Sequence, residues 1–276
     1  MTDLGRLALI MRLAGHPQGC LPDAVDPELT FPHPCHVGMG RFAMTDKILG
    51  VLGGMGPLAS AQFMLRLTLL TPAAKDQDHI PAVLWSDPRI PDRGAAAQGG
   101  ADPLPWLLRG IEGLKRAGCG AIVIPCNTAH AWYEPMLRAA EMPVPHIVDA
   151  AAADLARIGI KPGRIGLMGT ATTLRMKLYQ QRLTQLGWEC IEPSEDQMVR
   201  LVSPAIALVK GNQVADAYEP LAEVANSLAA QGARAVVLGC TEIPLGIQAG
   251  PAARLRVPVI DTIDALARAA IAWARG

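Results

Sequence analysis

The sequence contains few aromatic residues: phenylalanine, tryptophan and tyrosine together make up 4% of its 276 residues. Half of the residues are nonetheless hydrophobic, so alanine and the branched aliphatic residues must form most of the core. Helices packed on parallel strands are built from such aliphatic runs. We therefore expect an α/β protein, with either one large domain or two of ordinary size.

The chain also lacks an excess of charge of either sign, because 25 Lys+Arg balance 25 Asp+Glu. No basic stripe is visible, which argues against nucleic acid as a partner. No run of about 18 apolar residues occurs, so we expect no membrane span. A small molecule remains as the expected partner.

The six cysteines lack the dense spacing of a disulfide framework and include no CxxC pair: Cys20, Cys35, Cys119, Cys126, Cys190 and Cys240. Scattered cysteines indicate a cytoplasmic protein with reduced thiols, in which a thiol in a special loop is a candidate for chemistry. The stretch 33–36, His-Pro-Cys-His, is too tightly spaced for a tetrahedral metal site. We therefore expect no metal.

The region 1–43 differs from the rest of the chain, and we expect it to be a poorly ordered N-terminal extension. From residue 47 onward, apolar runs that end in glycine or proline alternate with helical patterns, which predicts a parallel α/β sheet. The expected strands are 48–52, 82–85, 121–125, 165–168 and 235–238. The expected helices are 57–70, 104–117, 147–158, 174–186, 219–230 and 264–273.

An internal repeat divides this part of the chain into two similar halves. Residues 47–54 resemble 164–170, residues 113–130 resemble 227–244, and residues 144–156 resemble 257–269. Cys126 follows Gly53 by 73 residues, and Cys240 follows Gly169 by 71. A period near 114 residues is too long for a solenoid, so it indicates a duplicated α/β domain.

Each half places one cysteine at the carboxyl end of a strand, where ligands bind in open α/β sheets. If the halves face each other, Cys126 and Cys240 lie on opposite walls of one cleft. Two opposed thiols can invert a stereocentre, because one removes a proton from one face and the other returns a proton to the opposite face. The alternative is that both cysteines are buried structural residues.

The residues beside these cysteines suit a carboxylate ligand. Asn127, Thr128 and Thr241 can donate hydrogen bonds to it. A proton next to a carboxylate is weakly acidic, and racemases often use pyridoxal phosphate as the electron sink. Here fixed hydrogen-bond donors can stabilise the developing charge instead, so we expect no cofactor.

At these residues the sequence resembles the aspartate/glutamate racemase superfamily, and its aspartate racemase branch most closely. The resemblance extends from residue 47 to the C-terminus and rests on five motifs: GGMGP (53–57), IPDR (90–93), PCNTAH (125–130), GLMGT (166–170) and GCTE (239–242). It implies two pseudo-symmetric α/β domains, each with a mostly parallel four-stranded sheet flanked by helices and with the active site in the cleft between them. The implied boundaries are 44–148 and 149–261, with a final helix, 262–276, packing back on the first domain. It also implies a homodimer.

The resemblance assigns a role to several residues. Cys126 takes the proton from the D-isomer and Cys240 from the L-isomer of an amino acid, most closely aspartate. The implied substrate-binding residues are Met55, Arg93, Asn127, Thr128, Ala129, Thr170, Lys210 and Thr241. His130 and Glu242 are candidates for acid/base support.

Alternatives stay open for several of these residues. Arg93 could form a surface ion pair, and Lys210 could be a helix C-terminal cation. His130 could orient Cys126 or cap a turn, and Glu242 could tune Cys240 or pair with a distant cation.

The substrate and the activity also have alternatives. Aspartate racemases often carry Thr after IPDR, where this chain has Gly94, so the substrate could be glutamate or a broader set of amino acids. Other activities of the superfamily are maleate isomerisation, hydantoin racemisation and arylmalonate decarboxylation, of which the last uses a single cysteine. A non-catalytic amino-acid-binding protein is a further alternative, because a fold does not fix a function.

Overall fold

The computed structural model describes residues 47–276. The predicted extension 1–43 and the stretch 33–36 lie outside the described residues. Among the described residues, no helix has the length and apolar character needed to cross a membrane. Nor does any group of three His, Cys, Asp or Glu side chains in this range have the arrangement of a metal site.

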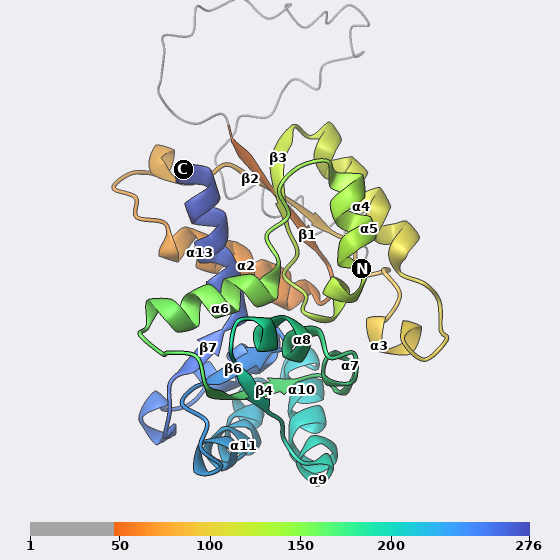
Figure 1. Ribbon diagram of the computed structural model, residues 1–276. Helices are drawn as coiled ribbons and strands as arrows, with labels where there is room; N and C mark the ends of the chain where they lie inside the picture. The colour runs from red at the N-terminus through yellow and green to blue at the C-terminus, as the bar shows by residue number, and fades with distance from the viewer. Residues whose placement is uncertain (1–46) are drawn as a thin grey trace, which may run out of the picture. The chain divides into compact units, whose positions relative to one another are not determined.

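The first sheet is parallel and has the strand order β2-β1-β3 (Figure 1). Its strands are β1 (Ile48–Gly53), β2 (Ala82–Ser86) and β3 (Cys119–Val123). The helices of this part of the chain are α2 (Pro57–Leu70), η1 (Asp76–Asp78), α3 (Arg93–Ala96), α4 (Leu104–Arg116), η2 (Thr128–Trp132) and α5 (Tyr133–Ala140).

The second sheet is also parallel and has the strand order β5-β4-β6-β7. Its strands are β4 (Arg164–Gly169), β5 (Glu189–Ile191), β6 (Val236–Gly239) and β7 (Val259–Asp261). The helices before and between these strands are α6 (Ile147–Arg157), α7 (Ala171–Arg175), α8 (Leu178–Gln185), α9 (Glu195–Gln197), η3 (Met198–Val202), α10 (Ser203–Lys210), η4 (Ala215–Ala217), α11 (Tyr218–Ala230), α12 (Ile243–Gln248) and η5 (Ala252–Arg254). The last helix is α13 (Thr262–Arg275).

The two sheets repeat one topology, because β1 lies between β2 and β3 just as β4 lies between β5 and β6. The prediction of an α/β fold with parallel sheets flanked by helices is confirmed. The predicted four strands are present in the second sheet, whereas the first sheet has three. The division into two domains at residue 148 stays a prediction.

A proline explains why the first sheet lacks its fourth strand. The Pro143 carbonyl accepts a hydrogen bond from the Ile122 N–H at 3.0 Å, just as the Pro258 carbonyl accepts one from Val236 at 3.0 Å. Beyond Pro258 the chain continues as β7. Beyond Pro143 the next ladder position is Pro145, which has no N–H to donate, so the pairing stops. In the structure Pro143 is therefore the equivalent of Pro258. The sequence repeat, which aligns 144–156 with 257–269, instead aligns Pro145 with Pro258, two residues further along the chain.

The predicted helix over 174–186 is wrong, because the structure has two helices there. α7 ends at Arg175 and α8 begins at Leu178. Lys177 between them has a φ of 55°, in the left-handed region that cannot continue an α-helix. The apolar periodicity of the sequence continues across Lys177, so the sequence pattern does not reveal the break between α7 and α8.

One hydrophobic core joins the two sheets. Leu49 and Val51 of β1 belong to the same cluster as Leu167 of β4 and Val237 of β6. Leu52, the residue of β1 that follows Val51, belongs to a second cluster with Ile122 of β3 on the other face of the first sheet. This alternation is the two-residue period of a strand that is buried on both faces.

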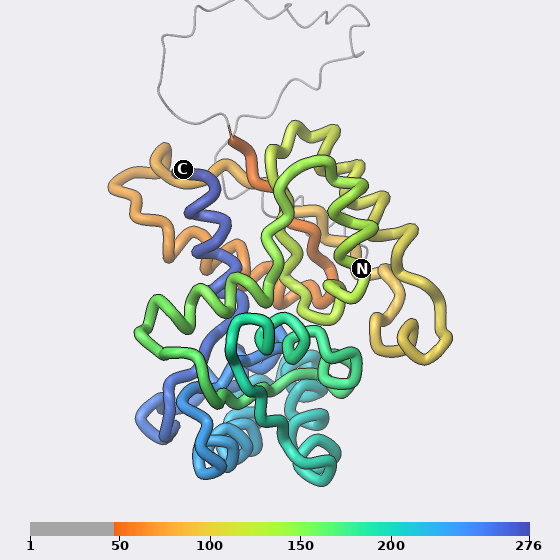
Figure 2. The backbone as a smooth tube through the Cα atoms, in the orientation of Figure 1, coloured from red at the N-terminus to blue at the C-terminus, as the bar shows by residue number. Residues whose placement is uncertain are grey.

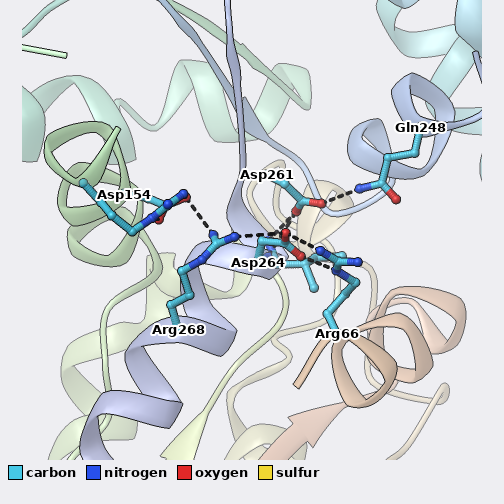
Figure 3. Close-up of polar contacts among 8 residues, drawn as sticks. Arg66, Asp154, Gln248, Asp261, Asp264 and Arg268 are labelled. Atoms are coloured by element: carbon cyan, nitrogen blue, oxygen red, sulfur yellow. Dashed lines mark hydrogen bonds and ion pairs between the residues drawn. The ribbon is translucent and has the colours of Figure 1, made fainter. Parts of the chain in front are cut away.

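The final helix returns to the beginning of the described chain. α13 packs against α2 and α6, and Figure 2 shows its blue trace beside the orange trace of α2. Arg66 of α2 binds Asp264 of α13 through two hydrogen bonds of 2.5 and 2.6 Å, and Arg268 of α13 contacts Asp154 of α6 at 2.9 Å (Figure 3). Asp261 accepts hydrogen bonds from the first N–H groups of α13 and from Gln248. These contacts fix α13 where the two halves meet.

Candidate active site

A pocket of about 150 Å³ lies beyond the carboxyl ends of β1, β3, β4 and β6. Ten of the predicted site residues line it: Met55, Arg93, Cys126, Asn127, Thr128, Thr170, Lys210, Cys240, Thr241 and Glu242. Asp92, Gly94 and Thr172 complete the lining. Residues from both repeats therefore meet in one pocket, as parallel strands that end at a common edge allow.

Two predicted site residues, Ala129 and His130, do not line this pocket. Both are buried behind Cys126. The Ala129 backbone forms a hydrogen bond with the Cys126 thiol. Its place therefore suits contact with Cys126 better than contact with a substrate.

The Cys126 thiol is buried, with 5% of the residue exposed, and lies in the turn between β3 and η2. Burial raises its pKa, because a thiolate loses its hydration. The Arg93 guanidinium and the Ala129 N–H act in the opposite direction and lower the pKa of Cys126. Arg93 and Ala129 thus favour the Cys126 thiolate, while burial and the Glu242 carboxylate oppose it.

The Cys240 thiol is equally buried, with 3% of the residue exposed, but it has an anionic neighbour. Its Sγ donates a hydrogen bond to Glu242 Oε2 at 3.1 Å. Burial and the Glu242 carboxylate together raise the pKa of Cys240 well above its usual value, while Lys210 lowers it. Among residues 47–276, Glu242 forms no ion pair with a cation. Its negative charge therefore acts on Cys240 and favours the neutral thiol over the thiolate.

Arg93 is held by backbone carbonyls and forms no surface ion pair within the described range. Its Nη1 donates to the carbonyls of Ile90 at 3.3 Å and Pro91 at 3.0 Å, and its Nη2 donates to Met55 at 3.1 Å. A guanidinium has five N–H donors, so two remain. One of them is Nε, which is buried and has no partner among the described residues. The side chain is therefore fixed, and its two remaining donors are available to the Cys126 sulfur or to a ligand.

Lys210 is the last residue of α10 and has an exposed side chain. It stands at the C-terminus of this helix, where a cation is favourable, and it also lines the pocket. Its Nζ has no hydrogen bond or ion pair in the part of the chain that the structure describes. The ammonium is therefore available to an anionic ligand.

Three threonine hydroxyls join the two repeats at the edge of the pocket. Thr128 Oγ1 lies 2.8 Å from Thr173 Oγ1 and 3.3 Å from Thr170 Oγ1, and the last two are 2.9 Å apart. Thr128 belongs to η2, and Thr170 caps α7. A hydroxyl can donate and accept, so this triangle can turn a donor toward a bound carboxylate.

The Asn127 side chain forms hydrogen bonds with two other residues of the protein. The Tyr179 hydroxyl donates to its Oδ1, and its Nδ2 donates to Thr262 Oγ1 at 3.2 Å. Thr262 in turn donates to the Leu238 carbonyl, two residues before Cys240. One N–H of the Asn127 amide is left for a ligand. The turn that carries Cys126 is thus linked to the strand that carries Cys240.

His130 connects Cys126 to the start of α6. Its Nδ1 lies 2.9 Å from the Cys126 carbonyl, and its Nε2 accepts a hydrogen bond from the Ile147 N–H at 3.3 Å. These two partners require a neutral ring, with the proton on Nδ1. Burial lowers the pKa of His130 to about 4, which keeps the ring neutral at pH 7.

The family described as Asp/Glu/Hydantoin racemase matches residues 52–270. The chain belongs to this family. It is therefore an enzyme of the racemase class, an isomerase, as the motifs predicted.

Three similar proteins illustrate the range of the family. A broad specificity amino-acid racemase, RacX, of Bacillus subtilis (strain 168) is 25% identical over 228 residues, which cover 81% of this chain and 96% of RacX. A glutamate racemase of Deinococcus radiodurans is 32% identical over 196 residues, which cover 70% of this chain and 61% of that protein. The structure of Picrophilus torridus aspartate racemase superposes with a TM-score of 0.72 at 33% identity, covering 83% of this chain and 94% of that one. The named relatives are thus all amino-acid racemases.

Proposed function

We propose that the protein interconverts L- and D-aspartate by two-base proton transfer between Cys126 and Cys240, without a cofactor. The observation that carries this proposal is that both thiols line one pocket of about 150 Å³, together with Arg93 and Lys210. Each thiol comes from an equivalent turn of a repeated fold. The likeness to Picrophilus torridus aspartate racemase supports aspartate as the substrate.

In the proposed reaction one sulfur acts as a thiolate while the other is a thiol. For the D-isomer, the Cys126 thiolate removes the α-proton, and the Cys240 thiol delivers its own proton to the opposite face. For the L-isomer the roles are reversed, so each turnover moves one proton from the substrate to one cysteine and one from the other cysteine to the product. The enzyme then carries its single proton on the other sulfur.

The charge that develops on the α-carboxylate needs fixed donors when no cofactor takes it up. The free N–H groups of Arg93, the Lys210 ammonium and the hydroxyls of Thr128 and Thr170 border the same pocket. Arg93 and Lys210 also suit the two carboxylates of aspartate, one for each cation. Gly94 leaves space beside Asp92 and Thr172, because a Cβ at that position would lie 2.9 Å from Asp92 Oδ1 and 3.3 Å from Thr172 Oγ1.

The neighbours of the thiols predict where the proton rests. Arg93 favours the thiolate at Cys126, and Glu242 holds the proton on Cys240. The free enzyme would then be ready for the D-isomer. For the L-isomer, the single proton must first move from Cys240 to Cys126, so that Cys240 is the thiolate and Cys126 the thiol.

The cytoplasmic location, the homodimer and the two-domain division remain part of the proposal. Sedimentation of the purified protein at several concentrations checks the dimer.

The proposal is tested by proton NMR of L-aspartate with the protein in D₂O. We expect the α-proton signal to disappear and D-aspartate to form, and we expect Cys126→Ala and Cys240→Ala each to abolish D-aspartate formation. Cys190→Ala is the matched control, because Cys190 does not line the pocket. Full activity in a Cys126→Ala/Cys240→Ala double variant would contradict the proposal.

A further inference from the structure

A second cavity of about 630 Å³ adjoins the pocket that holds the two thiols. Four residues line both spaces and form their shared wall: Asp92, Arg93, Lys210 and Glu242. The proposed proton transfer does not need this larger space.

The walls of the second cavity beyond the shared residues are largely apolar. Pro57 and Leu58 come from the first turn of α2, Ile90 precedes α3, and Val209 lies in α10. Leu58 is 43% exposed, so this cavity reaches the protein surface. Apolar walls of this kind bind methylene groups rather than a charged side chain.

The charges of the shared wall balance, because Arg93 and Lys210 are cationic while Asp92 and Glu242 are anionic. A site that accepts only acidic side chains needs an excess of positive charge around the side chain. The wall has no such excess once one cation has bound the α-carboxylate. It therefore does not exclude a neutral side chain.

The chemistry of the thiols fixes how a side chain must leave the first pocket. When the α-carbon has lost its proton it is planar, with one thiol above and one below. Its amino, carboxylate and side-chain substituents then lie in the plane between the sulfurs. A side chain longer than that of aspartate must leave sideways, and the adjoining cavity, which is lined by the same four residues, is large enough to receive it.

We propose that the second cavity is a side-chain compartment of the racemase site and accepts neutral, unbranched side chains longer than that of aspartate, such as that of methionine. This inference rests on the proposed proton transfer at Cys126 and Cys240. It predicts that the α-proton of L-methionine exchanges in D₂O and that D-methionine forms.

Leu58→Trp tests the location of the side chain, because the larger ring fills the rim of the second cavity and stays away from the thiols. We expect it to lower kcat/KM for methionine by about tenfold or more, the range in which hydrophobic pockets discriminate. For aspartate we expect a change within about twofold, because its side chain stops at the shared wall. Leu58→Ala is the second variant, and it should raise KM for methionine while leaving aspartate unchanged. Leu65→Trp is the matched control: Leu65 lies on the same helix, is 50% exposed and lines neither cavity.

The outcomes separate this inference from the proposed function. Exchange of aspartate without exchange of methionine would overturn the compartment and leave the racemase intact. Exchange of methionine that is equally fast in wild type, Leu58→Trp and Leu58→Ala would also overturn it, since the side chain would then lie elsewhere. If no amino acid exchanges its α-proton, the proposed function itself fails.

Discussion

Cys126 and Cys240 occupy equivalent turns of a repeated fold, yet a different charged residue acts most strongly on each thiol. Arg93 has the largest charge effect on Cys126, where Glu242 acts more weakly, whereas Glu242 accepts a hydrogen bond from Cys240, where Lys210 acts more weakly. Cys126 is also tied to α6 through His130, and the residue that follows Cys240 by four is Pro244, which cannot repeat that contact. The repeat thus places the thiols, and the unrelated residues around them set different proton affinities.

Replacement of the two cations of the pocket, Arg93 and Lys210, should have the largest effects on activity and should distinguish their roles. Arg93→Met should lower kcat/KM for aspartate by about 10²–10³-fold, because it removes a fixed, half-buried donor. Lys210→Met should cost about tenfold, because its exposed ammonium is screened by water. Steady-state kinetics in both directions measure these losses, with the melting temperature of each variant as a check on folding. A larger loss for Lys210→Met would mean that the half-buried Arg93 guanidinium is not the main anion-binding group.

His130 contacts the turn that carries Cys126 and not the turn that carries Cys240. Protonation of His130 should therefore destabilise the protein at the Cys126 turn. The pKa of His130 falls from 6.5 to about 4 on folding because of burial. The folded state therefore favours the neutral ring, and the resulting stability is present above pH 6.5 and is lost as the pH falls toward 4. We expect His130→Gln to remove about 2–3 kcal/mol of this pH dependence between pH 7 and 4.5.

Urea unfolding of wild type and His130→Gln at several pH values measures this difference. The free energy of unfolding should fall more steeply with decreasing pH in wild type than in the variant. Parallel pH profiles for the two proteins would show that His130 does not titrate as its burial implies.

Glu242→Gln should produce the smallest effect, confined to the other thiol. Burial and the Glu242 carboxylate raise the pKa of Cys240, so removal of the negative charge should shift its titration to lower pH. The pH dependence of alkylation by iodoacetamide, followed at the Cys240 peptide by mass spectrometry, measures the shift. Cys190 in the same protein is the internal control, and its profile should not move. A shift of Cys240 to higher pH would contradict the assigned role of Glu242.

Local patterns were sufficient to predict most of the fold. Pro57 in the first turn and the apolar residues after it predicted a helix over 57–70, which is the observed α2. The break at Lys177 could not be predicted, because a lysine with a positive φ depends on tertiary contacts that override local preference. The missing fourth strand of the first sheet follows from Pro145, whose lack of an N–H matters only once its ladder partner is known.

The residues of the candidate site likewise include some that local sequence patterns predicted and others that they did not. Cys126 and Cys240 were predicted because each follows an apolar strand in a repeated motif. Tyr179 and Thr262 were missed, although both bind Asn127, because they lie 52 and 135 residues away from it and belong to no motif. The fixation of Arg93 by the Met55 carbonyl is likewise a long-range contact that sequence spacing does not reveal.

Isotope exchange with single-thiol variants tests the central claim, that each thiol serves one face of the substrate, most directly. Cys240→Ala and Cys126→Ala are incubated separately with pure L- and pure D-aspartate in D₂O, and loss of the α-proton is followed by NMR. We predict that Cys240→Ala exchanges only the D-isomer and Cys126→Ala only the L-isomer, with no inversion in either variant. Exchange of both isomers by one variant would contradict the claim, because a single thiol would then reach both faces.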